Sequence, residues 1–192
     1  MPVQWTAAMI SPLEDLDGAP LLRTEVVLDE GHGEVADARL HVSALGVFEA
    51  TLNGIAVADD VLSPGWSSYE WRLRYRSYDV GHLLADHSVL GLALGNGWYR
   101  GRLTWSGQRA LYGDRLGAIA QLEVTFADGH RQVVVTDDSW TAGPSDVVAD
   151  DLYDGQTVDA RRRDDSWTRP GATPAGFGAV EVIDFDTSLL AP

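Results

Sequence analysis

The strongest structural signal in the sequence is the stretch Ala120-Gln121-Leu122-Glu123-Val124-Thr125-Phe126-Ala127-Asp128-Gly129. Apolar and polar residues alternate over positions 120–126, which is the pattern of a β-strand with one buried face. Asp128-Gly129 favours a tight turn, and the apolar residues 133–135 return along the first strand. The stretch therefore predicts an antiparallel β-hairpin.

Much of the remaining chain has the same period of two. Asn53-Gly54 lies between the alternating segments 48–52 and 55–57, so it predicts a second tight hairpin turn. The continuous apolar run 89–94 is typical of a central strand. Further strands are expected over residues 22–28, 40–44, 73–78 and 180–185.

Helical periodicity is scarce. Asp79 is placed to cap one turn over residues 80–84, and the Arg-, Asp-, Pro- and Gly-rich stretch 161–178 is expected to be a surface excursion. Many strands separated by turn residues predict an all-β fold. We expect one domain over residues 1–192, an antiparallel β-sandwich or jelly roll with at most one or two short helical turns.

Composition excludes several classes of function. The 192 residues carry a formal net charge of −15, which disfavours binding to nucleic acid and to anionic membranes. All 14 basic residues are Arg, a side chain suited to flat and bidentate contacts. There is no Cys, so disulfides, thiolate catalysis and Cys-based metal sites are excluded. GxSxG, HExxH and phosphate-loop motifs are also missing from the sequence.

Targeting signals are not visible either. The start Met1-Pro2-Val3-Gln4-Trp5 has no basic stretch followed by an apolar core, so no secretory signal is predicted. No apolar run approaches the roughly 20 residues of a membrane-spanning helix. The cellular compartment stays open, either cytoplasmic or set by other parts of a longer protein.

A series of motifs in fixed order resembles the N-terminal β-sandwich domain of bacterial α-L-rhamnosidases, over nearly the whole chain. The matching segments are Ser43-Ala44-Leu45-Gly46, Leu52-Asn53-Gly54, Leu62-Ser63-Pro64-Gly65-Trp66-Ser67-Ser68-Tyr69, Tyr75-Arg76-Ser77-Tyr78-Asp79-Val80, Gly95-Asn96-Gly97-Trp98-Tyr99-Arg100-Gly101, Tyr112-Gly113-Asp114, Tyr153-Asp154-Gly155 and Asp159-Ala160-Arg161. Two positions depart from the family pattern: Gln156 replaces the usual Glu, and Val158 replaces the usual Tyr.

The resemblance implies an accessory domain of a larger glycoside hydrolase. In that family the catalytic acid and base lie in a separate helical (α/α) barrel, so no catalytic residue is expected in this chain. Related domains include a calcium-dependent module that binds terminal L-rhamnose. The implied partners are therefore L-rhamnose or a rhamnoside glycan, and the catalytic barrel in cis.

Asp59-Asp60 is the candidate metal site. The resemblance places a Ca²⁺ carboxylate pair here, completed by backbone carbonyls of the loop 111–116, and Ca²⁺ takes six to eight oxygen ligands. The alternative is a solvated turn, which is also our interpretation of Asp137-Asp138, Asp150-Asp151 and Asp164-Asp165. Adjacent strand residues point to opposite faces, so such pairs do not form the opposed carboxylates of a glycosidase.

Candidate ligand-binding residues are aromatic or polar side chains near predicted turns. Structural alternatives stay open: Asn53 as a turn residue with positive φ, one of Trp98 and Tyr99 as core and the other as a rim residue, and Arg100 and Arg102 as partners of acidic groups. The full set of candidate ligand-binding residues is Asn53, Asp59, Asp60, Trp66, Trp98, Trp105, Tyr112 and Asp114.

Two functions remain open. The chain either contributes to L-rhamnose binding through aromatic stacking, or it is a structural domain that packs on the barrel and binds no sugar. Exposure of Trp66, Trp98 or Trp105 beside clustered carboxylates favours binding, whereas burial of all three favours the structural role. A stand-alone enzyme is not expected.

Overall fold

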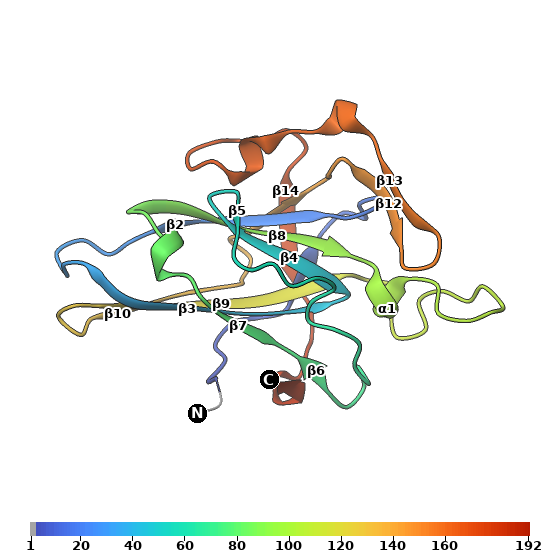
Figure 1. Ribbon diagram of the computed structural model, residues 1–192, viewed down its shortest axis with the longest axis horizontal. Helices are drawn as coiled ribbons and strands as arrows, with labels where there is room; N and C mark the ends of the chain where they lie inside the picture. The colour runs from blue at the N-terminus through green and yellow to red at the C-terminus, as the bar shows by residue number, and fades with distance from the viewer. Residues whose placement is uncertain (1–2) are drawn as a thin grey trace.

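The computed structural model describes residues 3–192 as an all-β domain (Figure 1). Eleven strands form one antiparallel sheet in the order β5-β4-β8-β2-β11-β14-β1-β9-β3-β7, with β10 paired to β9. The sheet strands are β1 (Ile10–Pro12), β2 (Leu21–Val27), β3 (Val35–Leu45), β4 (Val47–Leu52), β5 (Ile55–Ala56), β7 (Arg76–Asp79), β8 (His87–Gly95), β9 (Gly117–Phe126), β10 (Arg131–Val135), β11 (Thr141–Gly143) and β14 (Gly178–Val182).

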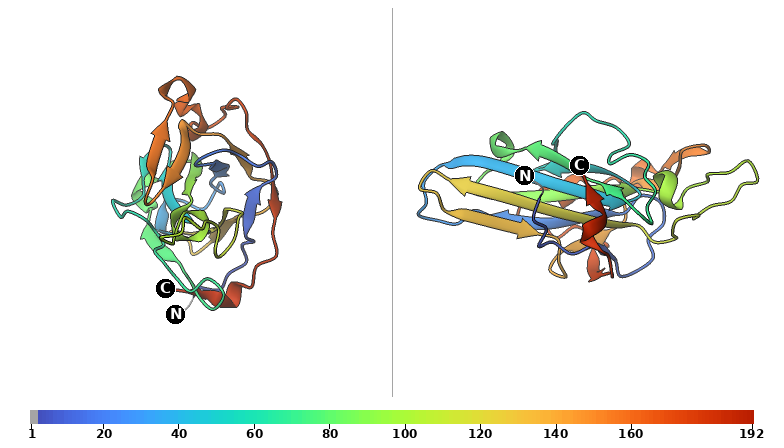
Figure 2. Two further views of the ribbon diagram at one scale, coloured as in Figure 1. Left: turned by 90° about the vertical axis from the view of Figure 1, so that its right-hand side faces the viewer. Right: turned by 90° about the horizontal axis from the view of Figure 1, so that it is seen from below.

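The sheet curls around a single main core, as the end-on view shows (Figure 2, left). The long strands β3 and β9 supply one wall and β2, β4 and β8 the other, so the strands form a sandwich. Buried side chains alternate along each strand, among them Leu40 and Val42 of β3 and Leu122 and Val124 of β9. The expected all-β class is confirmed.

Both predicted hairpins are confirmed. β9 and β10 pair around the turn at Gly129, whose φ is 89°. β4 and β5 pair around Asn53 and Gly54, which both have positive φ. The run 89–94 lies in β8, which is central because it pairs with both β2 and β4.

Helical turns are more numerous than the one or two expected. They are the one-turn helix α1 (Gly97–Arg100) and the 3₁₀ turns η1 (Gly81–Leu83), η2 (Ala160–Arg162), η3 (Asp165–Thr168) and η4 (Thr187–Leu189). Asp159, Asp164 and Asp186 each cap one of these turns with a side-chain oxygen. Short Asx-type caps of this kind leave no helical periodicity to detect in a sequence. Within residues 3–192, no helix has the length and apolar character needed to cross a membrane.

The segment 144–177 forms an additional layer over the sandwich (Figure 1, orange). It contains the hairpin β12 (Val147–Asp151) and β13 (Gly155–Val158), followed by η2 and η3. A separate two-stranded pair, β6 (Leu73–Arg74) and β15 (Leu190–Ala191), lies beside the C-terminus. The predicted excursion 161–178 therefore belongs to a larger covering segment.

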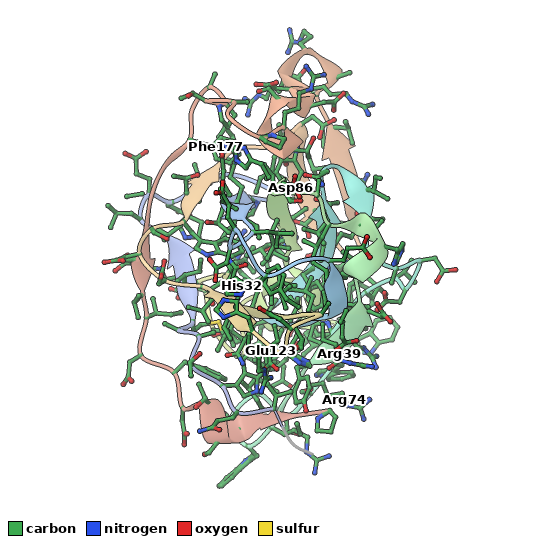
Figure 3. The ribbon with its side chains drawn as sticks, turned by 90° about the vertical axis from the view of Figure 1, so that its left-hand side faces the viewer. His32, Arg39, Arg74, Asp86, Glu123 and Phe177 are labelled. Atoms are coloured by element: carbon green, nitrogen blue, oxygen red, sulfur yellow. The ribbon has the colours of Figure 1, made fainter. Side chains whose placement is uncertain are left out.

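The end of the sandwich opposite α1 is closed by two stacked histidines, and His32 marks it in Figure 3. The rings of His32 and His130 lie 3.6 Å apart between centroids and are inclined by 11°. His32 Nδ1 lies 2.8 Å from the Asp128 carboxylate, and His130 Nε2 lies 2.7 Å from the Asp29 carboxylate, both within hydrogen-bond distance. These contacts join the loop after β2 to the β9–β10 turn.

Candidate functional site

The end of the sandwich around α1 brings together three of the predicted ligand-binding residues, Trp66, Trp98 and Tyr112. Two loops meet there, residues 57–72 and residues 101–116, and the second projects well beyond the sheet (Figures 1 and 2). The two loops carry Trp66 and Tyr112, while Trp98 lies on α1 between them. Side chains from distant parts of the sequence are thereby brought to one surface.

An aromatic cluster occupies this surface, formed by Trp66, Tyr69, Trp98, Tyr99 and Tyr112. The indole rings of Trp66 and Trp98 are parallel within 3°, with centroids 6.1 Å apart. Trp66 Nε1 donates a hydrogen bond of 3.3 Å to the Tyr112 hydroxyl. Trp66 is 52% exposed, so one side of the cluster is open to solvent.

The base of the aromatic cluster is buried. The Tyr69 ring contacts Tyr99 and Tyr112 at centroid distances of 5.0 and 4.8 Å. Burial raises the pKa of the Tyr69 hydroxyl well above its usual value, and burial likewise raises the pKa of Tyr99. Both hydroxyls therefore stay neutral at physiological pH and make the cluster an uncharged platform.

A network of charges holds the loop 101–110 in place. Asp151 accepts hydrogen bonds from the Arg102 backbone N–H at 2.8 Å and from Arg109 Nη1 at 2.6 Å. Asp154 accepts from Arg102 Nη2 at 2.7 Å, and the Arg102 guanidinium lies 5.1 Å from the Tyr153 ring centre. Arg102 is thus an ion-pair partner, as the structural alternative predicted.

The interpretation of Asp150-Asp151 as a solvated turn is wrong. The Asp151 side chain is only 3% exposed. Burial favours a higher pKa for Asp151, but backbone N–H donors and Arg109 outweigh it and lower the pKa. Asp150 accepts from the Asn96 backbone N–H at 2.7 Å, and burial raises its pKa. Asp150 fastens the β12–β13 hairpin to Asn96, directly after β8, and Asp151 fastens it to the loop 101–110.

The predicted metal pair lies at a separate, small cleft of about 190 Å³ that Asp59, Asp60 and Tyr78 line. The Asp60 carboxylate accepts hydrogen bonds from the Ser63 hydroxyl and, at 2.9 Å, from the Tyr78 hydroxyl. No residue of the loop 111–116 lines this cleft. Within residues 3–192, no group of three or more acidic or histidine side chains has the arrangement of a metal site.

The remaining predicted residues are dispersed. Asn53 donates to Leu83 O and Ser88 Oγ, both at 3.2 Å, and accepts from the Val89 N–H at 2.9 Å, so its amide is used inside the fold. Trp105 is fully exposed at the tip of its loop. Asp114 lines a different cleft, of about 360 Å³, together with Arg100 and Arg115.

Sequence reasoning overlooked an exposed tryptophan. Trp71, on the loop 57–72, is 79% exposed. It stands in a turn two residues before β6, and the sequence around it has no pattern that distinguishes an exposed ring from a buried one. The aromatic cluster is the only place, within the described residues, where two tryptophan rings stack on each other.

Comparison with known proteins gives a consistent result. The family model described as "Alpha-L-rhamnosidase N-terminal domain" matches residues 33–192. An α-L-rhamnosidase of Streptomyces avermitilis is 38% identical over 156 residues, which are 81% of this chain and 15% of the relative. Among solved structures, the native α-L-rhamnosidase of Aspergillus terreus superposes with a TM-score of 0.92 at 32% identity, covering 97% of this chain and 22% of the other.

A second solved structure is the Streptomyces avermitilis α-L-rhamnosidase complexed with L-rhamnose. It is 37% identical, with a TM-score of 0.82, and the match covers 88% of this chain and 16% of that one. The chain thus spans less than a quarter of the length of the relatives it matches.

Proposed function

This chain belongs to the family of α-L-rhamnosidase N-terminal domains, and we propose that it is a non-catalytic accessory domain that helps such an enzyme to bind terminal L-rhamnose. The longer protein would be a glycoside hydrolase whose catalytic barrel lies outside these residues. The likeness to a rhamnosidase that was solved with L-rhamnose supports the choice of sugar.

The observation that carries the proposal is the open aromatic cluster. Trp66 and Trp98 present parallel indole rings, and Trp66 is half exposed. The C–H face of a pyranose packs on such a ring, while the Tyr112 hydroxyl can exchange hydrogen bonds with a sugar hydroxyl. L-Rhamnose suits this surface because its methyl group adds apolar area to a neutral ring. Few groups engage one monosaccharide, so the affinity is weak.

Calcium at Asp59 and Asp60 is a second part of the proposal. Two carboxylates supply fewer oxygens than the six to eight that Ca²⁺ takes, so backbone carbonyls and water have to complete the shell. Asp60 already accepts two hydrogen bonds from hydroxyl groups. When bound, the ion would add a positive charge that attracts sugar hydroxyls.

Calorimetric titration of L-rhamnose into the protein tests the proposal. We expect saturable binding. Trp66→Ala should weaken the affinity by about tenfold, which is the effect expected when a central contact residue is truncated. Trp71→Ala is the matched control, because it removes an exposed tryptophan of the same loop outside the cluster. Titration with Ca²⁺, with chelator and on Asp60→Ala tests the metal separately. No heat with millimolar L-rhamnose in any condition would contradict sugar binding.

The exposed apolar side chains of the loop 57–72 support the alternative structural role. Val61 and Trp71 are 78% and 79% exposed, and large exposed apolar side chains on one loop are available for contact with another protein surface. In this alternative the loop packs on the catalytic barrel. Trp71→Ala would then weaken association with the separately produced barrel, whereas a rhamnose-binding role predicts no such change.

A further inference from the structure

The outer face of strand β8 has a row of very small residues, Gly91, Ala93 and Gly95. Side chains on a strand alternate between faces, so these three positions point away from the core. A Cβ atom on Gly91 would lie 2.4 Å from the Trp167 ring, and one on Gly95 would lie 3.1 Å from the Asp150 carboxylate. Trp167 and Asp150 therefore cover the two ends of the row and leave the middle, at Ala93, open.

Two clefts meet at this opening, with volumes of about 630 and 490 Å³. Both are lined by Glu49 and Ala93, which face each other across β4 and β8. Ala19 and Val147 are also shared by the two clefts. We call the joined clefts the outer groove. Residues of β4 and β8 form its floor, and residues of the segment 144–177 form its roof. Figure 1 shows the path of that segment over the sandwich.

The roof is fastened to the sheet, so the outer groove is preformed. The buried Arg23 donates to Ala172 O at 2.6 Å and to Arg169 O at 3.3 Å. The Ala19 N–H donates to Val147 O at 3.0 Å. Phe177 packs directly on Gly143, and Figure 3 places Phe177 on the side of this layer, away from His32. A site that is already formed loses less entropy when it binds.

The lining of the outer groove is suited to a neutral, hydroxyl-rich chain. Trp167 and Phe177 line the larger cleft and offer ring faces or edges to sugar rings. Arg162, Asp164 and other charged side chains of both signs stand beside them. The carboxylate of Glu49, exposed at the junction, makes no hydrogen bond to a described residue of the chain. An anionic ligand is disfavoured by these carboxylates and by the net charge of −15.

We propose that the outer groove is a second binding site, which holds consecutive sugar units of a neutral glycan chain beneath the segment 144–177. The two joined clefts give room for more than one ring, since a single ligand site commonly measures about 300–1,000 Å³. The inference goes beyond the proposed function, because it needs no rhamnose at the aromatic cluster.

The test compares two probes by calorimetry on the full 192-residue chain. One probe is a neutral linear oligosaccharide with a terminal α-L-rhamnose, and the other is the same oligosaccharide after the rhamnose has been removed. We expect the trimmed oligosaccharide to bind, and Ala93→Trp to weaken that binding by about tenfold because the indole fills the groove. Ala127→Trp, at the exposed β9–β10 turn, is the matched control.

A second variant and an NMR measurement keep the inference testable if the Ala93→Trp variant does not fold. Glu49→Gln keeps the shape of the side chain and should weaken binding of the trimmed oligosaccharide severalfold. The amide signals of Glu49 and Ala93 should shift during titration. The inference would be overturned if the trimmed oligosaccharide did not bind, or if the Ala93→Trp variant bound it as tightly as the parent protein. Failure of the proposed function has a different signature, which is absence of binding to free L-rhamnose.

Discussion

Arg109 Nη1 donates a hydrogen bond of 2.6 Å to Asp151, although 42 positions separate the two residues in the sequence. This contact fastens the loop that projects beyond α1 to the turn of the β12–β13 hairpin. The loop has few apolar contacts of its own, because Trp105 at its tip is fully exposed. Polar contacts to the buried Asp151 carboxylate and the exposed Asp154 carboxylate therefore determine how firmly the loop is held.

Asp151→Ala should release this loop. The variant loses several charge-assisted hydrogen bonds at a buried carboxylate, so the free energy of unfolding should fall by about 2–3 kcal/mol. Limited proteolysis should cut residues 101–110 faster than in the parent protein. Asp154→Ala is the control, since Asp154 is 47% exposed and surface ion pairs contribute under about 1 kcal/mol. Equal effects of the two variants would refute this role of Asp151.

The same carboxylate should make stability depend on acidity. Its pKa in the folded protein lies below the ordinary value of 3.8, because hydrogen-bond donors and Arg109 outweigh burial. The stabilisation is therefore complete above pH 3.8 and is lost as the pH falls through the folded pKa. Urea unfolding at several pH values should give a shallower acid dependence for Asp151→Ala than for the parent protein.

Tyr78 gives a prediction at alkaline pH. Burial, with the neighbouring Asp60 carboxylate, raises the pKa of the Tyr78 hydroxyl to about 12. In an ultraviolet titration, Tyr69 and Tyr99 also titrate late because burial raises their pKa values, so the Tyr78 signal is identified as the part of the late tyrosinate absorbance that changes in Asp60→Asn. Asp60→Asn should lower the Tyr78 midpoint part of the way towards 10, since burial remains. A late midpoint that persists unchanged in Asp60→Asn would mean that burial alone is responsible. Calcium bound at Asp60 would also lower the midpoint, which offers a second measurement of the proposed ion.

Substitution of Asn53 tests whether its side chain stabilises the turn or is available to bind ligand. Its φ is 53°, and its amide makes three hydrogen bonds within the fold. Asn53→Ala should lower the free energy of unfolding by about 2–3 kcal/mol through strain and lost bonds. Asn53→Gly removes only the bonds and should cost less. An unfolding free energy unchanged by Asn53→Ala would return Asn53 to the candidate ligand residues.

Local patterns predicted the parts of the structure that local forces determine. The Asn53-Gly54 and Asp128-Gly129 turns were predictable because positive φ and strand alternation are properties of short segments. The stack of Trp66 on Trp98 was not, since it depends on how two loops fold against α1. Asp151 was misread for the same reason: its partners Arg102 and Arg109 lie in another loop. The resemblance to rhamnosidase domains identified the family but not these contacts.

Trp167 packs on the outer face of β8. Its ring lies against Gly91, where no Cβ atom fits, and it closes one end of the outer groove. Trp167→Ala should lower the free energy of unfolding by about 2–4 kcal/mol, somewhat less than for a fully buried aromatic ring. Trp71→Ala, which removes an equally large but exposed ring, should stay within about 0.5 kcal/mol.

Gly91→Val tests the same contact from the other side. The added side chain would occupy the space of the Trp167 ring, so the ring must leave the sheet and its fluorescence should shift towards the red. Destabilisation by both Gly91→Val and Trp167→Ala, with no further loss in the double variant, would show that the two act through one contact. Additive losses would mean that Trp167 stabilises the roof independently of Gly91, and the small residues of β8 would then need another explanation.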